Sequence, residues 1–180
     1  LQGLTLKALK LYDEAIDTLY RATWDYAYHS AAYYELAQIS AIQGDFEKAL
    51  DQINESLRTN ATNNRAVALK ASVQRRMGNY HEAIATLQPL LQIDPLDFRA
   101  KNECFLAARE SGDVQKADKI IPSLNKEMRD FHENYLELAV GYLNDGLLEE
   151  AEEALRRFNG NNPLFDYYLG YIYDRQDNHD

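Results

Sequence analysis

The sequence QGDFEKAL at residues 43–50 determines how this chain is organised, because it recurs at a fixed interval. Related segments follow as MGNYHEAI at 77–84, SGDVQKAD at 111–118 and DGLLEEAE at 145–152. The glycines and the alanines five places after them are each separated by 34 residues. A constant period of this size predicts an array of stacked supersecondary units.

The residue types within the period predict a helix–turn–helix hairpin. A glycine between two helical segments accepts the positive φ that ends a helix without a Cβ clash. The next residue, Asp45, Asn79 or Asp113, is suited to cap the following helix. The small alanine lets two antiparallel helices approach closely. Each hairpin then has an apolar face that only its neighbours cover.

The pattern resembles the tetratricopeptide repeat family, whose consensus reads W-x2-L-G-x2-Y, then G, A-x3-F-x2-A and P. The second unit places Tyr33, Leu36, Ala37, Gly44 and Ala49 at consensus positions. The fifth unit places Tyr135, Leu138, Ala139, Tyr142, Gly146, Ala151, Phe158 and Pro163 there. The fourth unit diverges most, with Cys104 in its first helix and Arg129 where proline is usual.

The resemblance implies an all-α, right-handed superhelix (an α-solenoid) formed as a single array. We expect units at about residues 1–29 (partial), 30–63, 64–97, 98–131, 132–163 and 164–180 (partial). The chain begins without Met and within a repeat, which suggests a fragment of a larger protein.

The expected helices follow these units, and two of them contain proline. After a helix at 12–24, we expect pairs at 30–43 with 46–59, 65–77 with 80–92, 98–111 with 114–127 and 131–144 with 148–158, and a last helix at 165–176. Pro89 predicts a kink or early ending in the helix 80–92, and Pro122 predicts a bend in 114–127. The last junction is about three residues short, so we expect altered stacking of the final helix.

Composition narrows the classes of partner. The 180 residues carry a net charge of −10, which argues against nucleic acid, because phosphate binding requires clustered Lys and Arg. Residues 65–118 are less acidic, with eight basic and seven acidic side chains. No apolar segment approaches the ~20 residues that span a membrane. No targeting signal is visible, which leaves the compartment open and slightly favours the cytoplasm.

We find no constellation of residues that indicates an enzyme, a cofactor or a metal site. His29, His81, His132 and His179 lack the paired spacing of zinc ligands. Cys104 occupies a position that is buried in the family, which indicates packing rather than nucleophilic chemistry. The acidic residues 149–153 open a helix, where their charge complements the helix dipole.

By resemblance to the family, the first helix of each hairpin lines a concave groove. Five arginines fall at groove positions, and Arg65/Arg99 and Arg75/Arg109 are each separated by one repeat. The candidate partner-binding residues are Tyr34, Gln38, Arg65, Ser72, Arg75, Arg76, Arg99, Asn102 and Arg109. Arginine's planar fork suits carboxylates, so loss of Arg75 and Arg109 together is expected to weaken binding. The alternative interpretation is that they pair with Glu103, Glu110 or Asp113 and keep the surface soluble.

The leading interpretation is a non-catalytic protein–protein interaction scaffold whose groove takes an acidic or C-terminal peptide. The alternative is a repeat segment of a larger bacterial carbohydrate-active or sugar-binding protein, since the tyrosine-rich residues 22–28 resemble such regions. An RNA-binding helical repeat is disfavoured by the period and the charge. The two ends lack a full set of neighbours, so weak self-association is expected there, with Tyr168, Tyr171 and Ile172 as contacts.

The register of the repeat can be tested by overpacking. Replacing Ala83 with Leu is expected to destabilise the fold by ~1–3 kcal/mol, because the larger side chain forces two helices apart. The same holds for Ala49, Ala117 and Ala151. Thermal melts of the four variants that coincide with wild type would show that the register is wrong.

Overall fold

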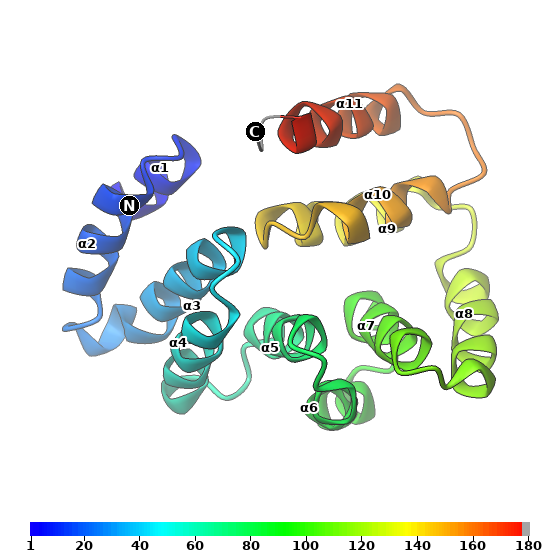
Figure 1. The fold of residues 1–180 in the computed structure, drawn as a ribbon, viewed down its shortest axis with the longest axis horizontal. Helices are drawn as coiled ribbons and strands as arrows, with labels where there is room; N and C mark the ends of the chain where they lie inside the picture. The colour runs from blue at the N-terminus through cyan, green and yellow to red at the C-terminus, as the bar shows by residue number, and fades with distance from the viewer. Residues whose placement is uncertain (178–180) are drawn as a thin grey trace.

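A computed structural model describes residues 1–177, and these fold entirely into helices and their connections (Figure 1). The helices are α1 (Gln2–Ala8), α2 (Tyr12–Ala22), α3 (Tyr26–Ile42), α4 (Phe46–Thr59), α5 (Asn64–Arg76), α6 (Tyr80–Ile93), α7 (Phe98–Glu110), α8 (Val114–Met128), α9 (His132–Asn144), α10 (Leu148–Arg156) and α11 (Pro163–Asp177). The predicted all-α solenoid of antiparallel hairpins is confirmed. His179 lies outside the described residues.

The repeated glycines and alanines act as their chemistry predicts. Gly44, Gly78, Gly112 and Gly146 all have φ between 75° and 81°. Ala49, Ala83 and Ala151 are completely buried, and Ala117 is buried as well. Asp45, Asp97 and Asp113 accept a backbone N–H bond at the start of the following helix. Asn79 occupies the same position but makes no side-chain capping bond.

One expected helix boundary is wrong, and neither proline ends its helix early. Helix α3 begins at Tyr26 rather than near residue 30, because Asp25 caps it by accepting the N–H of Ala27 at 2.9 Å. Helix α6 continues past Pro89 to Ile93, so proline does not end it early. Helix α8 likewise continues past Pro122 to Met128. Proline removes only one backbone bond, and the packed apolar face maintains each helix beyond it.

The stacking changes between the fourth and fifth hairpins. The backbones of α2 and α3, α4 and α5, and α6 and α7 run close together, whereas α9 lies further from α8. The connection turns at Arg129, which has φ 54° and stands where the family has proline. Consequently α9 contacts α7 and crosses the concave side of the array towards α3, where Asp145 bonds to Gln38.

A core nevertheless joins the fifth hairpin to the fourth. Leu124 and Met128 of α8 belong to the same buried cluster as Tyr135, Leu138 and Tyr142 of α9. Helix α11 joins this cluster through Phe165 and Ile172. The expectation that Ile172 forms an exposed contact is therefore wrong, because its side chain is completely buried, whereas Tyr171 is exposed.

The fifth hairpin comes into close contact with α3 at Gly146. A Cβ placed on Gly146 would lie 2.8 Å from the Cα of Ile42 and 2.7 Å from its Cγ1. Real Cβ atoms do not approach backbone atoms this closely. The same test at Gly44, Gly78 and Gly112 finds open space. Gly146 therefore serves both as a helix terminator and as a contact point between distant hairpins.

Alanine substitutions separate these two roles. Gly78→Ala is expected to cost about 1–2 kcal/mol, because a Cβ is strained at positive φ. Gly146→Ala carries the same strain and an additional steric penalty of about 1–3 kcal/mol from the contact with Ile42. Urea unfolding of both variants measures the difference, and equal losses would show that the hairpin does not rest on α3.

Candidate functional site

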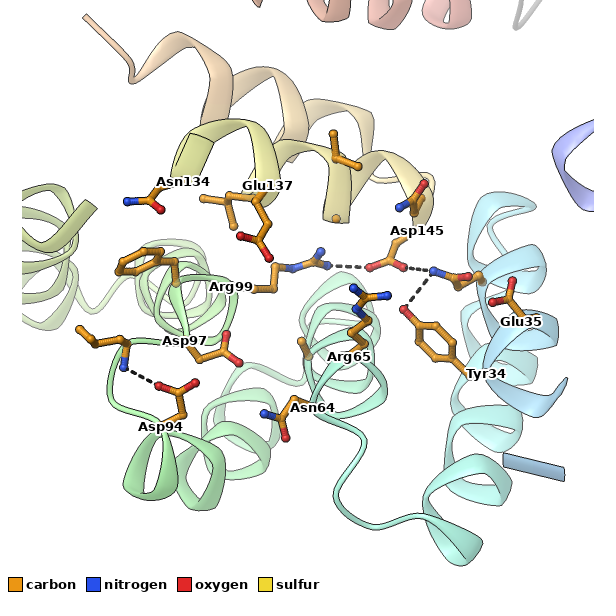
Figure 2. Close-up of a pocket in the computed structure, with 18 of the residues that line it drawn as sticks. Tyr34, Glu35, Asn64, Arg65, Asp94, Asp97, Arg99, Asn134, Glu137 and Asp145 are labelled. Atoms are coloured by element: carbon orange, nitrogen blue, oxygen red, sulfur yellow. Dashed lines mark hydrogen bonds and ion pairs between the residues drawn. The ribbon is translucent and has the colours of Figure 1, made fainter. Parts of the chain in front are cut away.

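The concave side of the array holds an open cavity of about 680 Å³ (Figure 2). Side chains from α3, α5 and α7 line one side of it, and side chains from α9 line the other. The first helices of the second to fifth hairpins therefore all contribute side chains to this cavity. Four predicted partner-binding residues line this cavity, namely Tyr34, Gln38, Arg65 and Arg99.

Arg65 is the accessible cation of this cavity. Its side chain is exposed and lies beside Tyr34 (Figure 2). Among the side chains of residues 1–176, no carboxylate pairs with it. Helix α5 positions it, because Asn63 caps that helix by accepting the N–H of Ala66 at 3.3 Å.

Tyr34 contributes a hydroxyl next to Arg65. Its oxygen accepts a bond from Gln38 Nε2 at 3.0 Å. Burial, followed by the negative charge of Asp145, raises the pKa of Tyr34 above its usual value. The phenol therefore stays protonated at physiological pH and keeps a proton that it can donate into the cavity.

Arg99 is held by groups of the chain itself. Its Nη2 donates to Asp145 at 2.9 Å and to Ser72 Oγ at 2.9 Å. Its guanidinium also lies 3.6 Å from the ring centroid of Tyr142. Burial raises the pKa of Asp145, and Arg99 and Gln38 offset this effect only in part. Arg99 thus links α7 to the end of α9.

Arg75 lies at the centre of a buried ion-pair network. It donates to Glu103 at 2.8 Å, to Glu110 at 2.7 Å and to Glu150 at 2.6 Å. Its side chain is 1% exposed and Glu103 is fully buried. Burial alone would raise the pKa of Glu103, but Arg75 and Arg99 outweigh it and hold this pKa below its ordinary value. Arg75 therefore has no surface to offer a partner in this structure.

The other predicted residues also bind groups within the chain. Arg109 forms a bidentate pair with Glu153, at 2.8 and 2.9 Å, and Arg76 contacts Glu149 at 3.2 Å. Asn102 is buried and donates to the Tyr142 hydroxyl at 2.6 Å. The alternative of internal pairing is confirmed for Arg75 with Glu103 and Glu110, but not for Asp113, which caps α8.

The acidic residues of the fifth hairpin have a larger role than the sequence suggests. Glu149, Glu150 and Glu153 all contact arginines of the third and fourth hairpins, in addition to opening α10. Asp145 does the same through Arg99. Sequence reasoning also missed Lys7 of α1, which lines the cavity and pairs with Glu35 at 2.6 Å. The sequence did carry a signal for these pairs, namely an excess of acidic residues in the fifth repeat and of arginines in the third and fourth.

The described side chains that could hold a metal ion or act as a nucleophile lie apart from one another. Within the described part of the chain, no three His, Cys, Asp or Glu side chains are arranged to hold a metal ion. Cys104 is buried, which raises the pKa of its thiol to about 11, so it is a poor nucleophile. Over the same residues, no helix combines the length and apolar character that membrane crossing demands.

The helical hairpins and the cavity on their inner side define an α-solenoid, a class of protein that presents a concave surface. The family model described as Tetratricopeptide repeat matches residues 1–64, and a second model with the same description matches residues 65–95. The chain therefore belongs to the tetratricopeptide repeat family. A comparison with curated proteins found no match.

Solved structures agree with this assignment of the fold. A tetratricopeptide repeat protein from Parabacteroides merdae ATCC 43184 is 19% identical with a TM-score of 0.68, over 97% of this chain and 69% of that one. MamA from Desulfovibrio magneticus RS-1 is 14% identical with a TM-score of 0.64, over 99% of this chain and 93% of that one. YrrB, described as a TPR protein with an unusual peptide-binding site, is 16% identical with a TM-score of 0.61, over 98% and 84%.

The buried network predicts unequal costs for two arginine substitutions. Arg75→Ala is expected to destabilise the protein by about 3–5 kcal/mol, because it leaves buried carboxylates without a counter-charge. Arg109→Ala also breaks an arginine–carboxylate pair, but an exposed one, and is expected to cost about 1 kcal/mol or less. Urea unfolding at pH 7 measures both, and similar costs would contradict the network's importance.

The cost of Arg75→Ala should also depend on pH. In wild type the lowered pKa of Glu103 gives stability above the unfolded-state value of about 4.3, which is lost as pH falls. In the variant, Arg75 no longer offsets the cost of burying the charge of Glu103. The ionised Glu103 therefore destabilises the fold above that pH. The difference between the two proteins is therefore expected to be largest at pH 7 and to shrink towards pH 4.

Proposed function

We propose that this chain is a non-catalytic protein–protein interaction scaffold that holds a peptide in its concave cavity, with the peptide's terminal carboxylate at Arg65. The observation that carries the proposal is an exposed arginine in a concave site, to which no carboxylate of the described residues is paired. A guanidinium matches a carboxylate in geometry and charge. The Tyr34 hydroxyl beside it supplies a second donor.

The other charges in the cavity favour one terminal carboxylate over a strongly acidic ligand. Arg99 is neutralised by Asp145, and Lys7 is paired with Glu35. Asp94, Asp97 and Glu137 line the same cavity and would repel a second anion. Their oxygens are suited instead to accept N–H bonds from a peptide backbone. Of the two classes that the sequence suggested, the C-terminal peptide therefore fits better than the acidic one.

The comparisons support this class of function at the level of the fold. Arrays of this family present concave surfaces to proteins, and YrrB is described as having a peptide-binding site. The net charge of −10 and the acidic cavity wall disfavour nucleic acid. The carbohydrate-associated alternative draws no support from the families or structures that match.

Peptide binding tests the proposal. An immobilised library of peptides with free C-termini is compared with the same library carrying C-terminal amides. We expect the free carboxylate to be preferred and Arg65→Ala to weaken binding by about ten- to a hundredfold, since a bond to a charged group contributes ~1.5–3 kcal/mol. Added salt should weaken binding in the same way.

The matched control is Arg58→Ala. Arg58 is exposed on α4 and pairs with Glu55 at 2.9 Å, and it lies outside the lining of the cavity. Its loss changes the net charge equally and should leave binding unchanged. Peptides that bind equally well as amides, with affinity unaffected by Arg65→Ala, would refute the proposed anchor.

A further inference from the structure

A second hollow, of about 510 Å³, separates the first hairpin from the last helix. We propose that this hollow, the terminal cleft, binds an apolar side chain next to an Asp or Glu, upstream of the C-terminal carboxylate in the same peptide. Residues of α1 line one side of it, and Tyr167, Tyr168 and Tyr171 of α11 line the other. The inference rests on the proposed function, because it extends the bound peptide beyond Arg65.

The charge of the terminal cleft is opposite to that of the whole protein. Among the described residues, its lining includes Lys7, Lys10 and Arg175 but only one carboxylate, Glu35. Glu35 is already paired with Lys7 at 2.6 Å. Among the described residues, no carboxylate pairs with Lys10 or Arg175. Within the described part of the chain, two cations therefore remain for a ligand, in a protein whose net charge is −10.

Arg175 is already held in position. Its Nη1 donates to the Tyr171 hydroxyl at 2.9 Å, and its guanidinium lies 5.5 Å from the centroid of the same ring. An arginine held in this way loses little rotamer freedom when it binds a carboxylate.

The walls of the terminal cleft are aromatic and apolar. Tyr167 and Tyr171 expose 65% and 38% of their surfaces, which is ample for stacking against a ligand side chain. Ile42, Val140 and Leu143 line the same hollow. An apolar residue is thus the favoured neighbour for the carboxylate that Lys10 and Arg175 attract.

Helix α11 is fixed in place on its opposite side. Phe165 stacks on Phe158 with ring centroids 4.6 Å apart, and Ile172 is completely buried. Figure 1 shows that α11 lies across from α1, and residues of both helices line the cleft. The tyrosine wall is therefore part of the folded array.

The terminal cleft adjoins the concave cavity. Lys7, Glu35, Val140 and Asn144 line both hollows. An extended peptide anchored at Arg65 can pass these four residues and place an upstream side chain between α1 and α11. The partner is accordingly an extended C-terminal segment with an acidic–apolar pair upstream of its last residue.

A position-scanning library of peptides with free C-termini tests the inference on the full chain. We expect selection of Asp or Glu next to an apolar residue at upstream positions. The variant Lys10→Asn/Arg175→Ala should lose this selection and bind the selected peptides about tenfold more weakly, while it retains the preference for a free C-terminus. Asn suits Lys10, whose φ is 60°. Tyr167→Ala should weaken selection of the apolar residue alone.

The control variant Arg21→Ala/Arg58→Ala removes two exposed cations that line neither hollow and should behave as wild type. Binding that depends on Arg65 and on the free carboxylate, but without upstream selection, would overturn the terminal cleft and leave the proposed function intact. Upstream selection that depends on Lys10 and Arg175, without dependence on Arg65, would support the cleft and overturn the carboxylate anchor.

Discussion

The buried guanidinium of Arg75 is the constraint on which the arrangement of the third, fourth and fifth hairpins depends. It contacts carboxylates of α7 and α10 from its own position on α5. A charge with almost no access to water is stable only when every partner is in place. Three hairpins must therefore keep one relative position. This requirement also fixes the shape of the cavity on their concave side, because the ion pair of Arg99 and Asp145 lies next to the Arg75 network.

This constraint divides the inward-facing arginines into two groups. Arg75, Arg76, Arg99 and Arg109 form the first group, because each of them pairs with a carboxylate of another hairpin. Arg65 stands apart, because the fifth hairpin brings no carboxylate to it. Identical residues at equivalent repeat positions thus differ in role, and the difference comes from which part of the chain lies opposite them.

The sequence was sufficient to predict the hairpins. It was not sufficient to predict how the fifth hairpin folds back towards the second. The 34-residue period and the small Ala49 and Ala83 report local packing, so the helices and their buried faces were predictable. The turn at Arg129 was not predictable. Once the residue at the junction between two hairpins departs from the repeat pattern, that pattern carries no information on the angle between them. The pairing of Glu150 with Arg75 spans 75 residues and follows only from that angle.

The bond between Gln38 and Asp145, 107 residues apart in the chain, has a consequence for how the protein folds. An open repeat array contains only contacts between neighbouring units, so its units can unfold progressively from either end. Contacts between hairpins two and five raise the contact order, and a higher contact order slows folding. Loss of either hairpin also removes the partners of the other. Cooperative unfolding of the central hairpins, rather than sequential fraying, is the behaviour that this closed arrangement imposes.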